Sequence, residues 1–140
     1  MAWMTRSSGK ETDVAEESDA CGVEVVHAEA VRAARNRVPS DPEIARAVEI
    51  AGLLSNPTRL RIVTALGPSR DEEGLELCVC DLAAVAATSE THTSHNLRAL
   101  RLAGVVTQRR DGRLVYYRLG DDPVVRGMVA AVARARVRSS

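Results

Sequence analysis

Apolar residues recur at helical spacing through most of this 140-residue chain and alternate as in a β-strand near its end. The first strong helical pattern starts at Asp41, where an acidic residue followed by Pro42 makes a favourable helix N-terminus. The pattern predicts a core helix to about residue 55. The expected apolar face of that helix consists of Ile44, Val48, Ala51 and either Leu53 or Leu54.

A second helix is expected to start at Pro57 and to stop at Gly67. Asn56 suits its N-cap because the Asn side chain accepts a hydrogen bond from the first turn, and Pro57 suits the first helical position. The residues of this helix expected in the core are Leu60, Val63 and Leu66.

The next segments predict a very short strand over 75–77 and a helix over 78–87. Thr88 or Ser89 then caps a further helix, which Gly104 ends. Beyond it the period changes to two, and residues 105–120 form two β-rich runs around Asp111-Gly112. This dipeptide supplies the positive φ angles of a tight hairpin turn, so a β-hairpin is expected here.

A last helix is expected over about 122–136, and a short one over 23–35 before the break at 38–42. Together, the last and the first helix carry more apolar surface than so small a core can bury, so a dimer interface is expected. The element order predicts a mainly α fold with a β-hairpin wing, a winged helix-turn-helix. The apolar residues of the last helix are Val124, Val125, Met128, Val129 and Val132.

Composition divides the chain into three parts. Residues 1–20 are polar, acidic and aperiodic, which is typical of a disordered tail. Residues 21–39 are expected to form a separate N-terminal segment, and 40–138 to form the winged helix-turn-helix domain, a fold that binds DNA and would here also dimerise. No segment resembles a signal peptide, and no apolar run approaches the roughly 20 residues that cross a bilayer. A cytoplasmic protein with no membrane association is expected.

The formal net charge of zero conceals a strong asymmetry along the chain. Residues 96–140 carry ten Arg against three Asp, whereas residues 1–95 carry nine basic and sixteen acidic groups. The C-terminal part therefore has a local positive field of the kind that attracts phosphate. Abundant Arg with no such role is the alternative reading.

The helix before the hairpin has two distinct stripes. Thr93, Leu97 and Leu100 share one and are expected to pack in the core. The other stripe offers short hydroxyls, an imidazole and a guanidinium, which can reach base edges and phosphates in a major groove. The wing arginines are expected to contact neighbouring phosphates. The candidate DNA-binding residues are Ser89, Thr91, Ser94, His95, Arg98, Arg109, Arg110 and Arg113.

Two thiols, Cys78 and Cys80, lie one residue apart in the stretch ELCVCDLA. Residues two apart on a regular helix point about 200° away from each other, so these thiols chelate a metal poorly from within a regular helix. From a frayed first turn they can chelate it. Thiolates select soft or borderline ions, which need three or four ligands. Cys21 is the one other cysteine and lies on a segment expected to be mobile enough to reach them. Inert buried thiols are the alternative.

These motifs together resemble the ArsR/SmtB family of metal-responsive repressors. ELCVCDLA is similar to the metal box of that family, TSETHTSHNLRALRLAGVV to its recognition helix, and RRDGRLVYYRLGD to its wing. The resemblance covers residues 44–136 closely and is strongest to the cadmium/lead-sensing branch. It implies a metal site built from Cys78 and Cys80 together with Cys21 of the other protomer.

The same resemblance implies either a fourth ligand or a trigonal site of three sulfurs. Val25 stands near the position of a fourth cysteine in some members, and His27 is the candidate in its place. A second zinc site on the last helix is expected to be absent, because only Asp121 of its ligand set is present. Cd²⁺ or Pb²⁺ is the expected inducer, and Zn²⁺ is a less favoured candidate because it is a less soft ion.

The expected function is that of a homodimeric repressor that binds an imperfect palindromic operator and releases it when a soft metal binds the thiolates. One alternative keeps the DNA binding and makes Cys78, Cys80 and Cys21 a redox sensor. Arsenite is another possible inducer, although the box lacks a third cysteine. A metal-buffering protein is a third alternative. No constellation typical of an enzyme is present.

Overall fold

The computed structural model describes residues 27–67 and 74–139, with side chains to residue 135, and separates two compact units, 1–40 and 41–140. In the N-terminal unit, helix α3 spans Ala28–Arg35 and has no buried residue. It covers the C-terminal part of the helix expected over 23–35, of which 23–26 lie outside the described residues. Within the described ranges, no helix has the length and apolar character needed to cross a bilayer.

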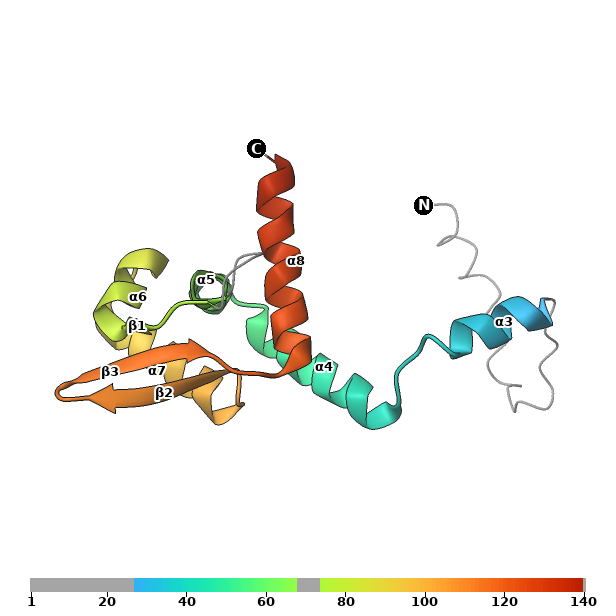
Figure 1. The fold of residues 1–140 in the computed structure, drawn as a ribbon, viewed down its shortest axis with the longest axis horizontal. Helices are drawn as coiled ribbons and strands as arrows, with labels where there is room; N and C mark the ends of the chain where they lie inside the picture. The colour runs from blue at the N-terminus through green and yellow to red at the C-terminus, as the bar shows by residue number, and fades with distance from the viewer. Residues whose placement is uncertain (1–26, 68–73, 140) are drawn as a thin grey trace. The chain divides into compact units, whose positions relative to one another are not determined.

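The C-terminal unit is a winged helix-turn-helix, as the sequence predicts (Figure 1). Helices α6 and α7 form the helix-turn-helix, and strands β2 and β3 form the wing, whose tip projects beyond the helices (Figure 1). In chain order the elements are α4 (Asp41–Leu54), α5 (Pro57–Leu66), β1 (Leu77–Cys78), α6 (Val79–Ala86), α7 (Glu90–Leu102), β2 (Val106–Asp111), β3 (Leu114–Leu119) and α8 (Pro123–Ser139).

Helix α5 is the centre of the packing, because it contacts α4, α6, α7, α8 and strand β3. Its N-terminus is capped as predicted: the Asn56 side chain accepts a hydrogen bond from the Arg59 N–H at 3.0 Å. Burial of the core side chains removes them from water and supplies most of the driving force for folding. The largest apolar side chains in the core are Ile50, Ile62, Val63, Leu66, Leu82, Leu97, Leu100, Val105, Val106, Val125 and Val129.

Two predicted core faces are partly wrong. In α4 the buried residues are Ile50 and Leu54, whereas Ile44 is 40% exposed, Val48 is 65% exposed and Ala51 is exposed. The periodic positions predict that the face with Ile44 and Val48 is buried, but the core packs against the face of α4 that carries Ile50 and Leu54.

A smaller error of the same kind occurs in α5. Val63 and Leu66 are buried there as predicted, but Ile62 is also buried and Leu60 is only partly so.

The three-stranded antiparallel sheet has the order β1-β3-β2. In the wing, Asp111 pairs with Leu114, so the turn residues are Gly112 and Arg113 rather than the expected Asp111 and Gly112. Gly112 has φ +67°, a left-handed conformation that favours glycine. Strand β1 lies one to two residues later than expected, at Leu77–Cys78.

The base of the wing lies against the end of α7. The Gly120 N–H donates to the Val105 carbonyl at 2.8 Å, and the Val105 N–H donates to the Leu100 carbonyl at 2.9 Å. A Cβ at Gly120 would lie 2.8 Å from the Gly104 carbonyl oxygen, so no larger residue fits between these two segments. Helix α7 and the wing therefore meet backbone to backbone.

An ion pair joins three helices next to this junction, where Arg46 lies close to Gly104. Arg46 of α4 donates to Asp122 Oδ2 at 2.8 Å and to the Ala103 carbonyl at the end of α7 at 3.0 Å. Asp122 Oδ1 also accepts from the Val124 N–H at 2.8 Å and so caps α8. Partial burial alone would raise the pKa of Asp122, but the hydrogen bonds from Arg46 and from the Val124 and Val125 N–H groups lower it overall.

We expect Asp122→Ala to lower the free energy of unfolding by about 1–2 kcal/mol, because it removes a helix cap and the partner of Arg46. The lowered pKa means that this contribution is present above pH ~4 and is lost as the pH falls through the folded-state pKa. The difference in the free energy of unfolding between the variant and the wild type should therefore become smaller in acid. Urea unfolding at one protein concentration, at pH 7 and at pH 3.5, measures both effects.

Asp121→Ala is the matched control, because the Asp121 side chain is 98% exposed and its pair with Arg126 is at 3.5 Å. Its effect should stay within about 0.5 kcal/mol. Equal losses for the two variants would show that Asp122 has no special role.

Candidate functional site

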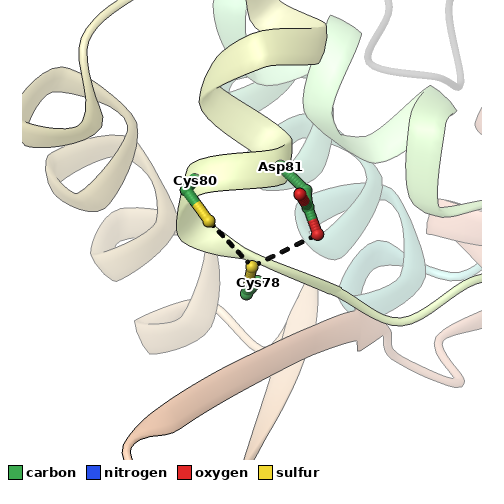
Figure 2. A group of neighbouring side chains, drawn as sticks. All are labelled: Cys78, Cys80 and Asp81. Atoms are coloured by element: carbon green, nitrogen blue, oxygen red, sulfur yellow. Dashed lines mark hydrogen bonds between the residues drawn. The ribbon is translucent and has the colours of Figure 1, made fainter.

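The two thiols of the ELCVCDLA stretch converge at the junction between β1 and α6 (Figure 2). Cys78 ends the strand and is the N-cap of α6, with an extended backbone at φ −86° and ψ 174°. Cys80 lies in the first turn of the helix. Because Cys78 is not itself helical, the two side chains turn toward each other, and their Sγ atoms are 3.1 Å apart. The sequence predicts convergence of the thiols through a frayed first turn, whereas in the structure the helix begins one residue later, at Val79, and Cys78 is extended.

Asp81 is a third member of this cluster, and the sequence analysis missed it. The Cys78 thiol donates to Asp81 Oδ2 at 3.2 Å, and one ligand atom from each of the three residues lies within 4.8 Å of the others (Figure 2). With Cys78 as N-cap, Asp81 is the third residue of the helix, where an acidic side chain reaches back to the cap. That spacing is the signal in the sequence that could have identified it.

The electrostatic surroundings keep the Cys80 thiol protonated at neutral pH. Its hydrogen bond with Cys78 raises the pKa of Cys80, and partial desolvation and the negative charges of Asp81 and Glu90 raise it further. Cys78 is buried and Cys80 is exposed, so the pair is reachable from solvent on one side. A cation that binds here must displace at least one proton.

The other two candidate ligands belong to the N-terminal part of the chain. Cys21 lies outside the described residues. His27 immediately precedes α3 in the N-terminal unit and is exposed. Its side chain forms no capping hydrogen bond with α3.

Helix α7 presents the predicted polar stripe to solvent. Thr91, Ser94, His95 and Arg98 are exposed, and the opposite stripe of Thr93, Leu97 and Leu100 is buried. Ser89 caps the helix by accepting a hydrogen bond from the His92 N–H at 3.0 Å. The exposed stripe has the length and the hydrogen-bonding groups to enter a major groove.

A buried polar residue supports this helix from behind. Asn96 is 2% exposed; its Oδ1 accepts from Arg59 Nε at 2.8 Å, and its Nδ2 donates to the His92 carbonyl at 3.0 Å. Arg59 thus ties α5 to α7. Periodicity does not identify Asn96, because a single amide beside Thr93 and Leu97 gives no periodic signal.

The three wing arginines differ in their surroundings. Arg109 of β2 is engaged by Glu76, with Nη2 2.9 Å from Glu76 Oε1, and lies over the ring of Tyr116. Arg110 and Arg113 are exposed near the tip of the hairpin. The candidate DNA-binding residues therefore lie on α7 and the wing, while the thiol cluster lies at the start of α6, which packs against α7.

Comparison with known proteins gives a consistent result. The profile described as "Bacterial regulatory protein, arsR family" matches residues 56–108. The chain is 42% identical to a transcriptional repressor SmtB homolog of Synechocystis sp., over 79% of each chain. It is 37% identical to a cadmium resistance transcriptional regulatory protein CadC homolog of Staphylococcus aureus, over 76% of this chain and 83% of that one.

Solved structures show the same architecture. HlyU from Vibrio cholerae aligns with a TM-score of 0.60 at 28% identity, over 70% of this chain and 99% of that chain. A homodimeric winged helix-turn-helix DNA-binding domain of a possible ArsR-family regulator from Mycobacterium bovis aligns with a TM-score of 0.53 at 30% identity, over 73% of this chain and 94% of that one. This chain therefore belongs to the ArsR family of bacterial regulatory proteins, which includes the SmtB and CadC repressors, and is a DNA-binding transcriptional regulator and not an enzyme.

Proposed function

We propose that this protein is a repressor that releases its operator when a thiophilic divalent ion binds Cys78 and Cys80. The observation that carries the proposal is the cluster of two sulfurs 3.1 Å apart with the Asp81 carboxylate beside them. Two sulfurs and one oxygen suit borderline and soft ions such as Zn²⁺, Cd²⁺ or Pb²⁺. Arsenite fits less well, because the cluster itself holds two sulfurs and only Cys21 could supply the third.

The proposed site is completed by Cys21 and His27 of a second protomer, as the likeness to the cadmium-sensing branch of the family implies. The exposed apolar residues Ile44 and Val48 of α4, together with Val132 of α8 at 37% exposure, support a homodimer, since α4 and α8 also contact each other. Two protomers related by a two-fold axis would match an imperfect palindromic operator.

In the proposed complex with DNA, the exposed stripe of α7 enters the major groove. Ser94, His95 and Arg98 present donors and acceptors to base edges and phosphates. Arg110 and Arg113 contact phosphates of the adjacent groove, which raises the affinity for DNA and its dependence on salt.

The coupling of the two sites follows from the packing of α6. A bound ion supplies coordination bonds that require thiolates, so Cys78 and Cys80 lose their protons and their mutual hydrogen bond. Any displacement of the first turn of α6 is transmitted to α7, because the two helices pack together. A coupling free energy of about 1–3 kcal/mol changes operator affinity by roughly 5- to 150-fold.

The short Sγ–Sγ distance also favours a second candidate function, that of a redox sensor. In this case the two thiols reduce a peroxide: they lose two protons and two electrons, a disulfide bond forms, and hydrogen peroxide becomes two water molecules. Release of DNA by peroxide in the absence of metal would favour this function over the metal-responsive one.

We expect Cys78→Ser and Cys80→Ser each to retain operator binding and to lose release by metal. The reduced protein, bound to a fluorescent promoter fragment, is titrated with Cd²⁺, Pb²⁺ or Zn²⁺ while anisotropy and the ultraviolet thiolate-to-metal absorption are recorded together. In the wild type the absorption should rise and the anisotropy fall at the same stoichiometry. Asp81→Asn should weaken metal binding by about 10-fold or more without abolishing it.

The matched control is Ser94→Ala, which alters the proposed DNA-contacting surface and leaves the thiols intact. It should weaken operator binding and keep the absorption change. Metal-dependent release that persists in both cysteine variants would rule out the assignment of the metal site.

Metal affinity should rise with pH. The raised pKa of Cys80 means that its thiol is protonated at neutral pH and must lose its proton when the ion binds. For each proton displaced, the apparent affinity for the metal should therefore rise about tenfold per pH unit, as long as the pH is below that pKa. Competition titrations with a chelator at pH 6, 7 and 8, corrected for the protonation of the chelator, measure this slope. A pH-independent affinity would show that thiolates are not the ligands.

A further inference from the structure

Arg109 of the wing is already bound by a carboxylate of its own chain. Its Nε lies 3.0 Å from both carboxylate oxygens of Glu76, and its Nη2 lies 2.9 Å from Oε1. The guanidinium also stacks on Tyr116, 4.9 Å from the ring centroid. Arginine binds carboxylate and phosphate through the same forked pair of N–H groups. Glu76 therefore occupies one forked pair of donors of Arg109, Nε and Nη2, through which a DNA phosphate could bind.

The neighbouring arginines are not held in this way. Within residues 27–67 and 74–135, Arg110 and Arg113 form no ion pair. Arg109 has a second, weaker contact with Asp111, at 3.8 Å. Its side chain is nevertheless 53% exposed, so a phosphate can approach it without unfolding of the wing.

The strand register explains why Glu76 reaches Arg109. Cys78 of β1 lies opposite Tyr116 of β3, and Tyr116 lies opposite Arg109 of β2. Because side chains alternate along a strand, Cys78, Tyr116 and Arg109 share one face of the sheet. Glu76, two residues before Cys78, falls on that face as well. The segment that leads into the thiol cluster thus also supplies the partner of Arg109.

We propose that Glu76 competes with DNA phosphate for Arg109 and so limits the affinity of the wing for DNA. This inference rests on the proposed function, because it requires a wing that contacts DNA. Binding of a phosphate through Arg109 has to break the pair with Glu76 and leaves a free carboxylate beside the DNA backbone. Both effects weaken binding, and an exposed pair of this kind is weak enough to open on each encounter.

The test uses the full-length, reduced, metal-free protein and a fluorescent double-stranded DNA fragment selected from random sequence by the wild type. Glu76→Gln preserves the shape of the side chain and removes its charge. It should bind this DNA about two- to fivefold more tightly, the change expected from loss of an exposed ion pair. The slope of log affinity against log salt should become steeper by up to about 0.9, because one more phosphate is neutralised.

The role of Arg109 is isolated by a double-mutant cycle. In an Arg109→Gln background, Glu76→Gln should lose most of its effect on affinity and on the salt slope. Glu49→Gln is the matched control: it removes the same charge from an exposed pair with Arg46 on α4 and should change neither quantity. Thermal unfolding checks that each variant is folded.

Two results would overturn the inference: an unchanged affinity and salt slope in Glu76→Gln, or an equal gain in the Arg109→Gln background. The second result would show that Glu76 acts only by general repulsion of DNA. A wild type that selects no DNA would instead contradict the proposed function itself, and that failure is visible before any variant is measured.

Discussion

The pairing of the two-residue strand β1 with β3 is the constraint on which the candidate sites depend. Leu77 lies opposite Tyr117 and Cys78 opposite Tyr116, so the backbone stays extended up to Cys78 and helix α6 cannot begin before Val79. If the helix began earlier, the two thiols would point about 200° apart. The same pairing aligns the segment before β1 with the wing and brings Glu76 to Arg109. One short strand therefore determines both the convergence of the two thiols and the pairing of Glu76 with Arg109.

Features that depend on neighbouring residues were predictable from the sequence. Asn56 and Ser89 cap their helices by bonding to the first turn, so each helix start follows from a few adjacent residues. The wing and its turn were also predicted, although the turn is displaced by one residue because strand pairing continues to Asp111. The exposed polar stripe of α7 followed from periodicity alone, because the same pattern that buries Leu97 and Leu100 leaves the other side in solvent.

Features that depend on contacts between distant segments were not predictable. The apolar residues of α4 indicate that this helix packs against another element, but not which of them the core buries. Ile50 and Leu54 are buried, whereas Val48 is exposed. The pair of Glu76 and Arg109 joins residues 33 positions apart, and each alone is an ordinary charged residue. Asp81 is different, since its position relative to Cys78 was visible and only the capping geometry was overlooked.

The close approach of Gly120 to the Gly104 carbonyl has a consequence for how DNA is recognised. No side chain separates the end of α7 from the base of the wing, and hydrogen bonds through Val105 join the two segments. The two elements proposed to contact DNA therefore keep a fixed separation at their junction. In the proposed complex, adaptation to small differences in groove width falls to the far end of the hairpin, where the side chains of β2 are exposed. In that complex, precise placement and tolerance to groove shape would arise at opposite ends of the same hairpin.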